Sequence, residues 1–363
     1  MNVTYLTRLV NRLNVHDVVV FLFVLFLPTQ FCTYFFMPFS YVSGVRVDYL
    51  APAIFATDIL IIVLAVLYWN TLKKILITKT HLLIFLLFFA HCILAYHPLL
   101  AIYKLIKYTE IYIVFLLFST LANVSRKIYI PLFLGATIEF FVSLFHLANG
   151  HSLQGLFYFL GERYFTLSTP GIAKAALFGV EFLRPYGTFS HPNSMGGFYL
   201  LVFFLSLFIF EKEKLPKRIA ILFISIALVV MSFSKIATGT LFFLYTGFLI
   251  YRLTSTCRLC SISRIISLAV IFFLVTLTQT DPQSLYKRIE LFKHAVFIVQ
   301  QHLLFGVGLG HYLLYEARIP FVYSFFSLQP VHNIFVLFLA ETGLIIFIVF
   351  GFLGVRFLAA YKK

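Results

Sequence analysis

Charged residues are scarce in this sequence of 363 residues: they make up 11% of it, and Asp and Glu together number only 13. A soluble domain carries about 25% charged residues and is far less apolar than this chain, in which apolar residues make up 61%. The shortage of charge therefore excludes a set of soluble domains divided by length. It predicts an all-α polytopic membrane protein.

Cysteine is also rare, occurring only as Cys32, Cys92, Cys257 and Cys260. The last two form a lone CxxC motif, "CRLC", with neither a second pair nor a nearby His, so a zinc site and a thioredoxin-like redox site are both disfavoured. We expect ordinary cytosolic thiols. A cleavable signal peptide is not expected either, because the polar N-terminal lead is long and no A-x-A site follows the first apolar run.

Acidic residues are so few that the formal net charge is +15. This balance could indicate a nucleic-acid partner, but a membrane protein with basic residues on its cytoplasmic side explains it better, so no nucleic-acid partner is expected. A membrane-spanning helix needs roughly 17 to 25 residues. About ten apolar runs predict such helices: residues 17–36, 51–69, 80–97, 99–121, 128–148, 195–211, 218–234, 236–252, 264–280 and 332–356.

Placing the N-terminus in the cytoplasm puts the short, densely basic connections on the inner side, and the opposite orientation would invert this bias. We therefore predict one integral domain over residues 1–363, in the plasma (inner) membrane, with both termini cytoplasmic. Two long connections then lie outside: loop one, about residues 149–194, and loop two, about residues 281–331. Long loops usually carry function. Amphipathic patterns in "GLFYFLGERYF" and "RIELFKHAVFIVQQHLLFGVGLGHYLLY" predict helical segments that either lie along the membrane surface or fold back into it.

Charges inside the predicted spans are costly, at roughly 2.5–3.5 kcal/mol each when unpaired. The run "LLAIYKLIKYTEIYIVFLLF" carries Lys104, Lys107 and Glu110, and the i, i+3 spacing allows the last two to pair. Either this is a structural pair, with Lys104 extending outward, or the lysines help to line an anionic cavity. Three further acids in spans are too scattered to predict a proton relay: Asp58, Glu139 and Glu341.

Loop one ends in "EFLRPYGTFSHPNSMGGFYLL", whose chargeable groups are Arg184 and His191. The five N–H donors of Arg184 suit phosphate oxygens, either of a substrate or of lipid headgroups. Asn193 either caps the following helix or contributes to a binding site. Lys235, in "SFSKIATGT", lies at the tip of an outer turn, where it either extends to the membrane surface or adds positive charge to that site.

Loop two contributes positive charge and a run of glycines, "GVGLG". The glycines lack the strand–turn–helix context of a nucleotide-binding motif, so we expect them to permit a turn between two surface helices. The cations of this loop are Lys287, Arg288 and Lys293.

His332 and Asn333 stand where loop two meets the last predicted span. Because the pKa of His lies near 6.5, His332 can accept a proton near neutral pH. A His at the start of a helix can also be purely structural. The presence of Arg184, Lys235 and Arg288 on the same predicted side favours a general base instead, with Asn333 holding its ring or a substrate hydroxyl. A direct pair with Glu341 is not expected, because nine helical residues place the two on opposite faces.

Four segments that occur in order, "RPYGTFSHPN", "SFSK", "YKRIELFKHAVFIVQQHLLFGVGLGHY" and "HNIFVLFLAETG", together resemble the O-antigen ligase and O-antigen polymerase superfamily. These are bacterial membrane glycosyltransferases that use undecaprenyl-diphosphate-linked glycans. The resemblance covers roughly residues 180–350. It implies that His332 activates the acceptor hydroxyl and that Arg184 and Arg288 bind the lipid diphosphate. The family often has Arg where this chain has Lys235, which lacks the bidentate fork.

The resemblance implies glycan transfer from an undecaprenyl-diphosphate donor onto an acceptor hydroxyl at the outer face of the membrane, with inversion at the anomeric carbon and without a metal or other cofactor. The sequence offers no His and Asp cluster at metal-ligand spacing. The acceptor may be a growing glycan, a lipid or a protein, and no motif chooses among them. A lipid-linked glycan flippase and a non-catalytic assembly subunit remain the alternative functions.

Overall fold

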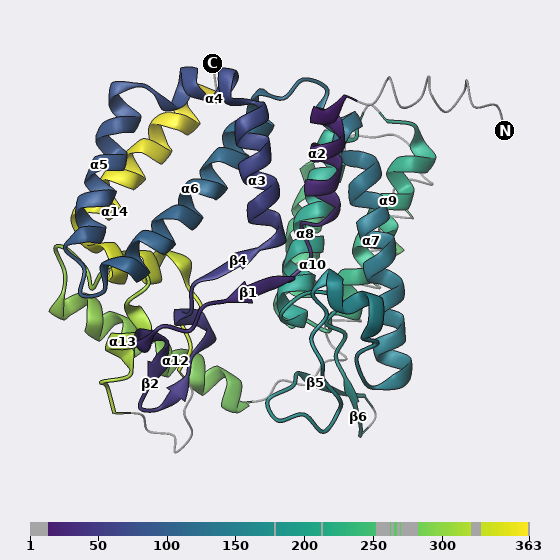
Figure 1. The fold of residues 1–363 in the computed structure, drawn as a ribbon. Helices are drawn as coiled ribbons and strands as arrows, with labels where there is room; N and C mark the ends of the chain where they lie inside the picture. The colour runs from purple at the N-terminus through teal and green to yellow at the C-terminus, as the bar shows by residue number, and fades with distance from the viewer. Residues whose placement is uncertain are drawn as a thin grey trace. The chain divides into compact units, whose positions relative to one another are not determined.

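The computed structural model of the chain describes residues 14–177, 179–211, 213–251, 262, 265, 266, 269, 282–320 and 328–361. Most of these residues are helical, as Figure 1 shows, which confirms a helical membrane protein in outline. Short strands also occur between the helices. The "CRLC" cysteines and nearly all of the predicted span 264–280 lie outside the described residues.

Each predicted span that falls on described residues overlaps a helix. The longer helices are α2 (Val15–Leu25), α3 (Ala56–Leu67), α4 (Trp69–Leu76), α5 (Lys79–Ile93), α6 (Pro98–Thr120), α7 (Val124–Asn149), α8 (Pro192–Ile209), α9 (Leu215–Met231), α10 (Lys235–Tyr251), α12 (Pro282–Gln301) and α14 (Ile334–Tyr361). A shorter helix, α13 (Tyr312–Glu316), follows α12 in loop two.

The structure does not confirm ten spans. Among the described residues, three helices are long and apolar enough to cross a bilayer: α7, α8 and the Ile334–Val355 part of α14. The pair α3 and α4 would make a fourth only as a broken span, because the chain bends by 86° between them.

The predicted first span, residues 17–36, is wrong in its extent. Helix α2 ends at Leu25, and the chain then turns through Pro28 into strand β1 (Cys32–Tyr34). Proline lacks a backbone N–H and so cannot continue a helix without losing a hydrogen bond. Strand β1 pairs with β4 (Ala53–Phe55), which lies where the second predicted span was expected to begin.

The chain divides into two compact units. Unit 1 comprises Met1–Cys32, Phe55–Leu64 and Leu121–Gln279. In it α8 and α7 both pack against α9, α2 packs on α7, and α10 packs on α8 (Figure 1). Loop one contains the 3-10 helix η3 (Gly155–Leu160) and an antiparallel hairpin of β5 (Lys174–Leu177) and β6 (Val180–Leu183). The segment "GLFYFLGERYF" therefore forms only the short 3-10 helix η3 and not an α-helix, and its expected position at the membrane stays a prediction.

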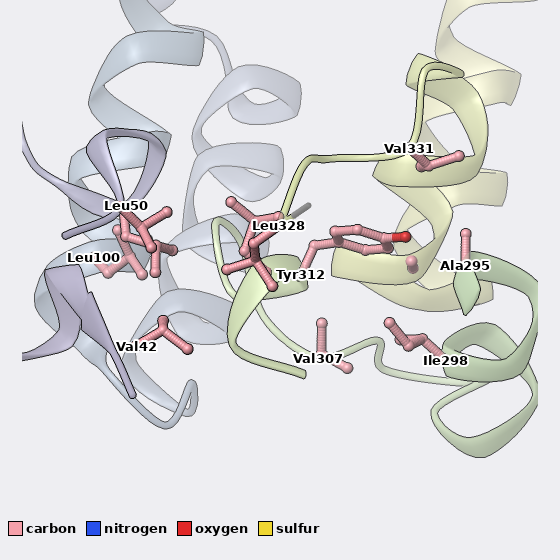
Figure 2. Packing of buried hydrophobic residues seen from close by; sticks show 12 residues of the cluster. Val42, Leu50, Leu100, Ala295, Ile298, Val307, Tyr312, Leu328 and Val331 are labelled. Carbon is pink, nitrogen blue, oxygen red and sulfur yellow. The ribbon is translucent and has the colours of Figure 1, made fainter. Parts of the chain in front are cut away.

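Unit 2 comprises Thr33–Ile54, Ala65–Thr120 and Thr280–Lys363. Here α5 packs on α6, and α12 packs on α13 and α14. The amphipathic helix expected in loop two is confirmed by α12. Figure 2 shows the buried cluster that joins loop two to the rest of this unit, with the Tyr312 ring between Leu328 and Ala295. A small hairpin of β2 (Tyr41–Val42) and β3 (Val45–Arg46) lies between η1 (Pro38–Ser40) and η2 (Asp48–Leu50).

Within unit 2, the charges of α6 are arranged as the spacing predicts. Lys107 Nζ lies 3.2 Å from Glu110 Oε2, so these two form the expected i, i+3 ion pair. Lys104 Nζ donates to the Tyr49 carbonyl oxygen at 3.3 Å and lies within electrostatic range of Glu341. Both partners belong to the protein, so these contacts support the structural reading of the lysines.

Candidate functional site

Arg184 follows β6 directly and is held by two acceptors from other elements of unit 1. Its Nε and Nη2 donate to the Ser232 carbonyl oxygen at 3.0 and 2.9 Å, and Nη2 also donates to Asn193 Oδ1 at 2.6 Å. Desolvation by burial lowers the pKa of Arg184, but a guanidinium stays charged in proteins. The Nη1 group has no hydrogen-bond acceptor among the described residues, so its two N–H donors are available to an anion.

The start of α8 differs from the sequence prediction. The N-cap is His191, whose Nδ1 accepts from the Asn193 backbone N–H at 3.1 Å, and Pro192 occupies the first helical position. Asn193 therefore does not cap this helix. Proline at the first position costs no intrahelical bond, which shifts the cap one residue before it. The Asn193 side chain is instead an acceptor for Arg184.

Lys235 is the first residue of α10 and follows three residues after Ser232, whose carbonyl oxygen Arg184 contacts. The short turn between α9 and α10 is tight: Phe233 adopts φ 49°, and its ring lies 4.8 Å from that of Phe182 in β6. The hairpin of loop one thus packs on this turn. The structure brings four predicted residues to one region of unit 1: Arg184, His191, Asn193 and Lys235.

A buried acid that the sequence reading left without a role fixes the segment between Arg184 and His191. Glu139 in α7 accepts from the Thr188 backbone N–H at 2.9 Å and also bonds the Thr188 hydroxyl. Gly187 has φ 57°, and a Cβ there would lie 2.0 Å from Glu139 Oε2. Glu139 therefore holds the "YGT" turn against α7, and only glycine fits beside it.

A second buried contact fixes the beginning of loop one to α7. His146 Nε2 lies 2.7 Å from Glu162 Oε1, and both side chains are fully buried. Glu162 also accepts from the backbone N–H groups of Leu153 and Gln154. Burial alone would raise the pKa of Glu162, but the hydrogen bonds from His146 and these amides lower it on balance. Neither contact has a local sequence signal, because the partners are far apart along the chain.

In unit 2, His332 and Asn333 precede α14, as predicted. Asn333 Oδ1 accepts from the backbone N–H groups of Phe335 and Val336 at 3.0 and 3.2 Å, so Asn333 caps the helix. His332 is exposed. Partial desolvation and the positive charge of Arg288 in α12 both lower the pKa of His332. The structure therefore brings His332 near Arg288 and favours the neutral imidazole. The two other cations of α12, Lys287 and Lys293, are exposed.

The last helix is broken, which corrects the prediction of a continuous span over residues 332–356. Gly343 in α14 has non-helical angles, φ 72° and ψ 174°. The Ala340 and Glu341 carbonyl oxygens accept from Val307 and Gly308, at 2.9 and 2.8 Å, instead of from their helical partners. The N–H groups of Leu344 and Ile345 donate to Leu303 and Leu304 in return. Residues 303–308 of loop two thus supply two donors and two acceptors in place of the hydrogen bonds that α14 loses at its break.

The glycines of loop two serve this contact as well as the turn that we predicted between α12 and α13. Gly306, Gly308 and Gly310 all have positive φ. A Cβ on Gly306 would lie 2.5 Å from the Glu341 backbone, and one on Gly343 would lie 2.4 Å from the Leu304 carbonyl oxygen. The backbones approach too closely for any other residue. This loop therefore has a structural role against α14.

Other buried polar groups support loop two. Neutral His311 is held as a single tautomer: its Nδ1 lies 2.9 Å from the Leu309 carbonyl oxygen, and its Nε2 accepts from the His97 backbone N–H. Glu316 is fully buried with no hydrogen bond to a described residue, and its Oε1 lies 3.7 Å from His294 Nδ1. Desolvation raises the pKa of Glu316 to about 8. Sequence reasoning did not identify these groups.

The candidate residues fall into two groups, one in each unit. Arg184, His191, Asn193 and Lys235 belong to unit 1, and Arg288, His332 and Asn333 belong to unit 2. Among the described residues, no cluster of three or more His, Cys, Asp or Glu side chains could hold a metal ion.

Comparison with known proteins gives one family. Residues 191–351 match the model of the O-Antigen ligase family, a region that covers less than half of the chain. No curated protein and no solved structure matches the chain significantly. The matched region begins at His191 and includes Lys235, Arg288, His332 and the break at Gly343, but Arg184 lies just before it. The match confirms the resemblance to the O-antigen ligase and polymerase superfamily.

Proposed function

From the O-antigen ligase domain at residues 191–351, we propose that this chain is an integral membrane glycosyltransferase that transfers or polymerises a glycan carried on undecaprenyl diphosphate. The two units would act together as one membrane domain. The acceptor is a hydroxyl at the outer face of the plasma (inner) membrane, and both chain termini are cytoplasmic. The proposal requires that the two groups of candidate residues act on the same donor and acceptor.

The arrangement of Arg184 is the observation that carries this proposal. Its guanidinium is already oriented by Ser232 and Asn193, so little side-chain entropy remains to be lost when an anion binds. Its Nη1 group offers two N–H donors, and each can form a charge-assisted hydrogen bond to a phosphate oxygen. Lys235, three residues after Ser232 in the chain, adds a second positive charge to this region. This is the chemistry needed to hold a diphosphate and to stabilise it as a leaving group.

His332 is the proposed general base. Its lowered pKa leaves the imidazole neutral near pH 7, as a proton acceptor must be. It takes the proton of the acceptor hydroxyl, whose oxygen attacks the anomeric carbon from the side opposite the diphosphate. The bond from that carbon to the diphosphate oxygen breaks, and undecaprenyl diphosphate leaves with the electron pair. The configuration inverts, and no metal takes part. Arg288 then serves both to keep His332 neutral and to bind the donor.

A transporter is the alternative that one observation favours, because transporters often contain broken helices near their substrate sites and α14 is broken at Gly343. In transporters, the freed carbonyl oxygens coordinate the coupling ion. Here the Ala340 and Glu341 carbonyl oxygens are both bonded to loop two. The break therefore offers no free carbonyls of this kind, and the glycosyltransferase remains the better proposal.

The test is an assay of purified protein in nanodiscs with a lipid-linked glycan, measuring the release of undecaprenyl diphosphate. We expect release that depends on an acceptor and is lost in His332→Ala. A protein that moves the lipid-linked glycan across a bilayer without releasing the diphosphate would establish the transporter instead. Glycan length and attachment in cells would then distinguish a polymerase, a ligase and a protein oligosaccharyltransferase.

Whether the two groups of residues share a site can be tested separately by a double-mutant cycle with Arg184→Ala and His332→Ala. Residues that act together at one site give non-additive effects on turnover, whereas independent sites give additive ones. Additive losses would refute joint action of the two groups even if each single variant were impaired. A matched control combines His332→Ala with Lys174→Ala. Lys174 is a cation of loop one, like Arg184, but it forms an ion pair with Glu181.

A further inference from the structure

The 3-10 helix η3 presents an exposed apolar surface that the catalytic proposal does not use. Leu156, Tyr158 and Phe159 are 83%, 55% and 64% exposed, and Phe31 beside them is 38% exposed. The Phe31 ring lies 6.2 Å from the rings of both Tyr158 and Phe159. These four side chains form one contiguous surface, which we call the aromatic patch. The segment from Ser152 to Gly161 contains no charged residue.

The backbone beneath the patch is firmly held, so its exposure is a property of the fold. Gly161, at φ 87°, packs directly on the chain at Gln30 and Phe31, where a Cβ would lie 2.4 Å from both backbone nitrogens. Glu162 accepts from two amides before η3 and contacts His146 at 2.7 Å. Large apolar surfaces that are exposed in this way mark interaction sites.

The contact with His146 fixes the depth of the patch. His146 lies three residues before the end of α7, so Glu162 is level with the last turn of this candidate span, about 4.5 Å below its end. The same turns of α7 expose Phe141, Leu144 and Phe145. Because α7 is apolar and long enough to cross a membrane, these side chains face lipid. The patch therefore belongs to the same end of this helix as these exposed apolar side chains.

The residues that follow the patch complete the pattern. Arg163 and Tyr164 are both exposed and come directly after the buried Glu162. Aromatic residues gather where a membrane meets water, and a neighbouring cation can reach the lipid phosphates. A sugar-binding surface would need polar groups among the rings, and the four patch side chains offer only the Tyr158 hydroxyl. Lipid is therefore the occupant that the chemistry fits.

We propose that the aromatic patch is a membrane anchor: Phe31, Leu156, Tyr158 and Phe159 insert into the boundary between headgroups and acyl chains of the adjacent leaflet. The anchor holds loop one at the depth of the lipid phosphates. This inference rests on α7, η3 and the adjacent chain at Phe31, and does not depend on the proposed function. If the proposed function is also correct, the anchor places Arg184, in the same loop, at the level where the diphosphate of a lipid-linked donor lies.

The chain has a single tryptophan, Trp69, which allows a direct test. In a Trp69→Phe background, Tyr158→Trp places one fluorophore in the patch, and Phe159→Trp serves if that variant does not purify as a monodisperse protein. The matched control is Val180→Trp, because Val180 is 68% exposed on the charged hairpin of loop one. Each variant is reconstituted in nanodiscs whose lipids are brominated either near the headgroup or near the chain end.

We expect Tyr158→Trp to be quenched strongly by bromine near the headgroup and weakly by bromine at the chain end. Acrylamide in the water should quench it with a Stern–Volmer constant several-fold smaller than that of Val180→Trp. Equal acrylamide quenching of the two variants would refute the anchor, as would acrylamide protection that appears only with added glycan. A blue-shifted emission that neither quencher affects would show a protein partner and would also refute it. None of these outcomes depends on transferase activity.

Discussion

Replacing Arg184 by lysine tests the proposed diphosphate site most directly, because the change keeps the charge and removes the guanidinium fork. In the structure, three hydrogen bonds from Nε and Nη2 orient the group, and Nη1 is left for the ligand. A lysine ammonium has three N–H donors against the five of arginine, so it cannot replace the three orienting bonds and still present two donors to the ligand. The variant should therefore fold and insert but bind the lipid-linked donor weakly.

The expected size follows from the bonds that are lost. A hydrogen bond to a charged group contributes about 1.5–3 kcal/mol. Losing one such bond to the diphosphate should therefore raise the Michaelis constant for the donor about 10- to 150-fold. Arg184→Ala should have a larger effect, because it also removes the charge and leaves the Ser232 carbonyl oxygen and Asn193 without their donor. Asn193→Ala should have a smaller effect, since it removes one orienting bond and keeps the fork.

The assay is the initial rate of undecaprenyl diphosphate release over a range of donor concentrations, with thermal unfolding of each variant measured in parallel. Lys174→Ala, on the same hairpin, controls for the loss of any positive charge from loop one. A Michaelis constant for Arg184→Lys within a factor of about two of the parent value, with unchanged stability, would refute the reasoning. The guanidinium would then be a structural group that bridges β6, α8 and the turn before α10.

Three further predictions concern other parts of the chain. His332→Ala should lower turnover by about 10²–10⁴-fold; because Arg288 lowers the pKa of His332, Arg288→Gln should move the acidic limb of the pH–rate profile to higher pH. Gly187→Ala should lower the melting temperature, since its Cβ would collide with Glu139, and unchanged melting would contradict the described turn. The pKa of Glu316 is raised to about 8, so the folded state holds a proton that the unfolded state releases. The free energy of unfolding should therefore fall as pH rises from about 4.5 to 8. Glu316→Gln should remove this pH dependence, which melting temperatures measured across that pH range would show.

Local spacing was enough to predict those parts of the structure that depend on neighbouring residues. The Lys107–Glu110 pair follows from an i, i+3 separation on one helix. Helix α12 follows from its amphipathic pattern. Lys235 was expected at the tip of a turn because few residues separate two apolar runs, and the structure places it at the start of α10. The contact of Arg184 with this turn had no local sequence signal, because Ser232 lies 48 residues further along the chain.

The features that escaped prediction depend on partners far away in the sequence. Helix α2 ends early because the chain leaves it to form β1, although the apolar run continues. Nothing near Glu139 indicates that it accepts from Thr188. Asn193 was a reasonable cap by its own chemistry, but the preceding His191 and Pro192 occupy the positions that decide the cap. The convergence of the two groups of site residues stays a prediction.

The break in α14 has a consequence for how this part of the molecule can assemble. Inside a bilayer, a backbone group without a partner costs several kcal/mol, so the two halves of α14 cannot separate at Gly343 until loop two supplies its amides and carbonyls. The "GVGLG" segment and the "AETG" segment therefore satisfy each other's backbone groups, and neither conformation is stable inside the bilayer without the other. Deleting the "GVGLG" segment would remove these partners, so we expect α14 to be a straight helix in such a variant.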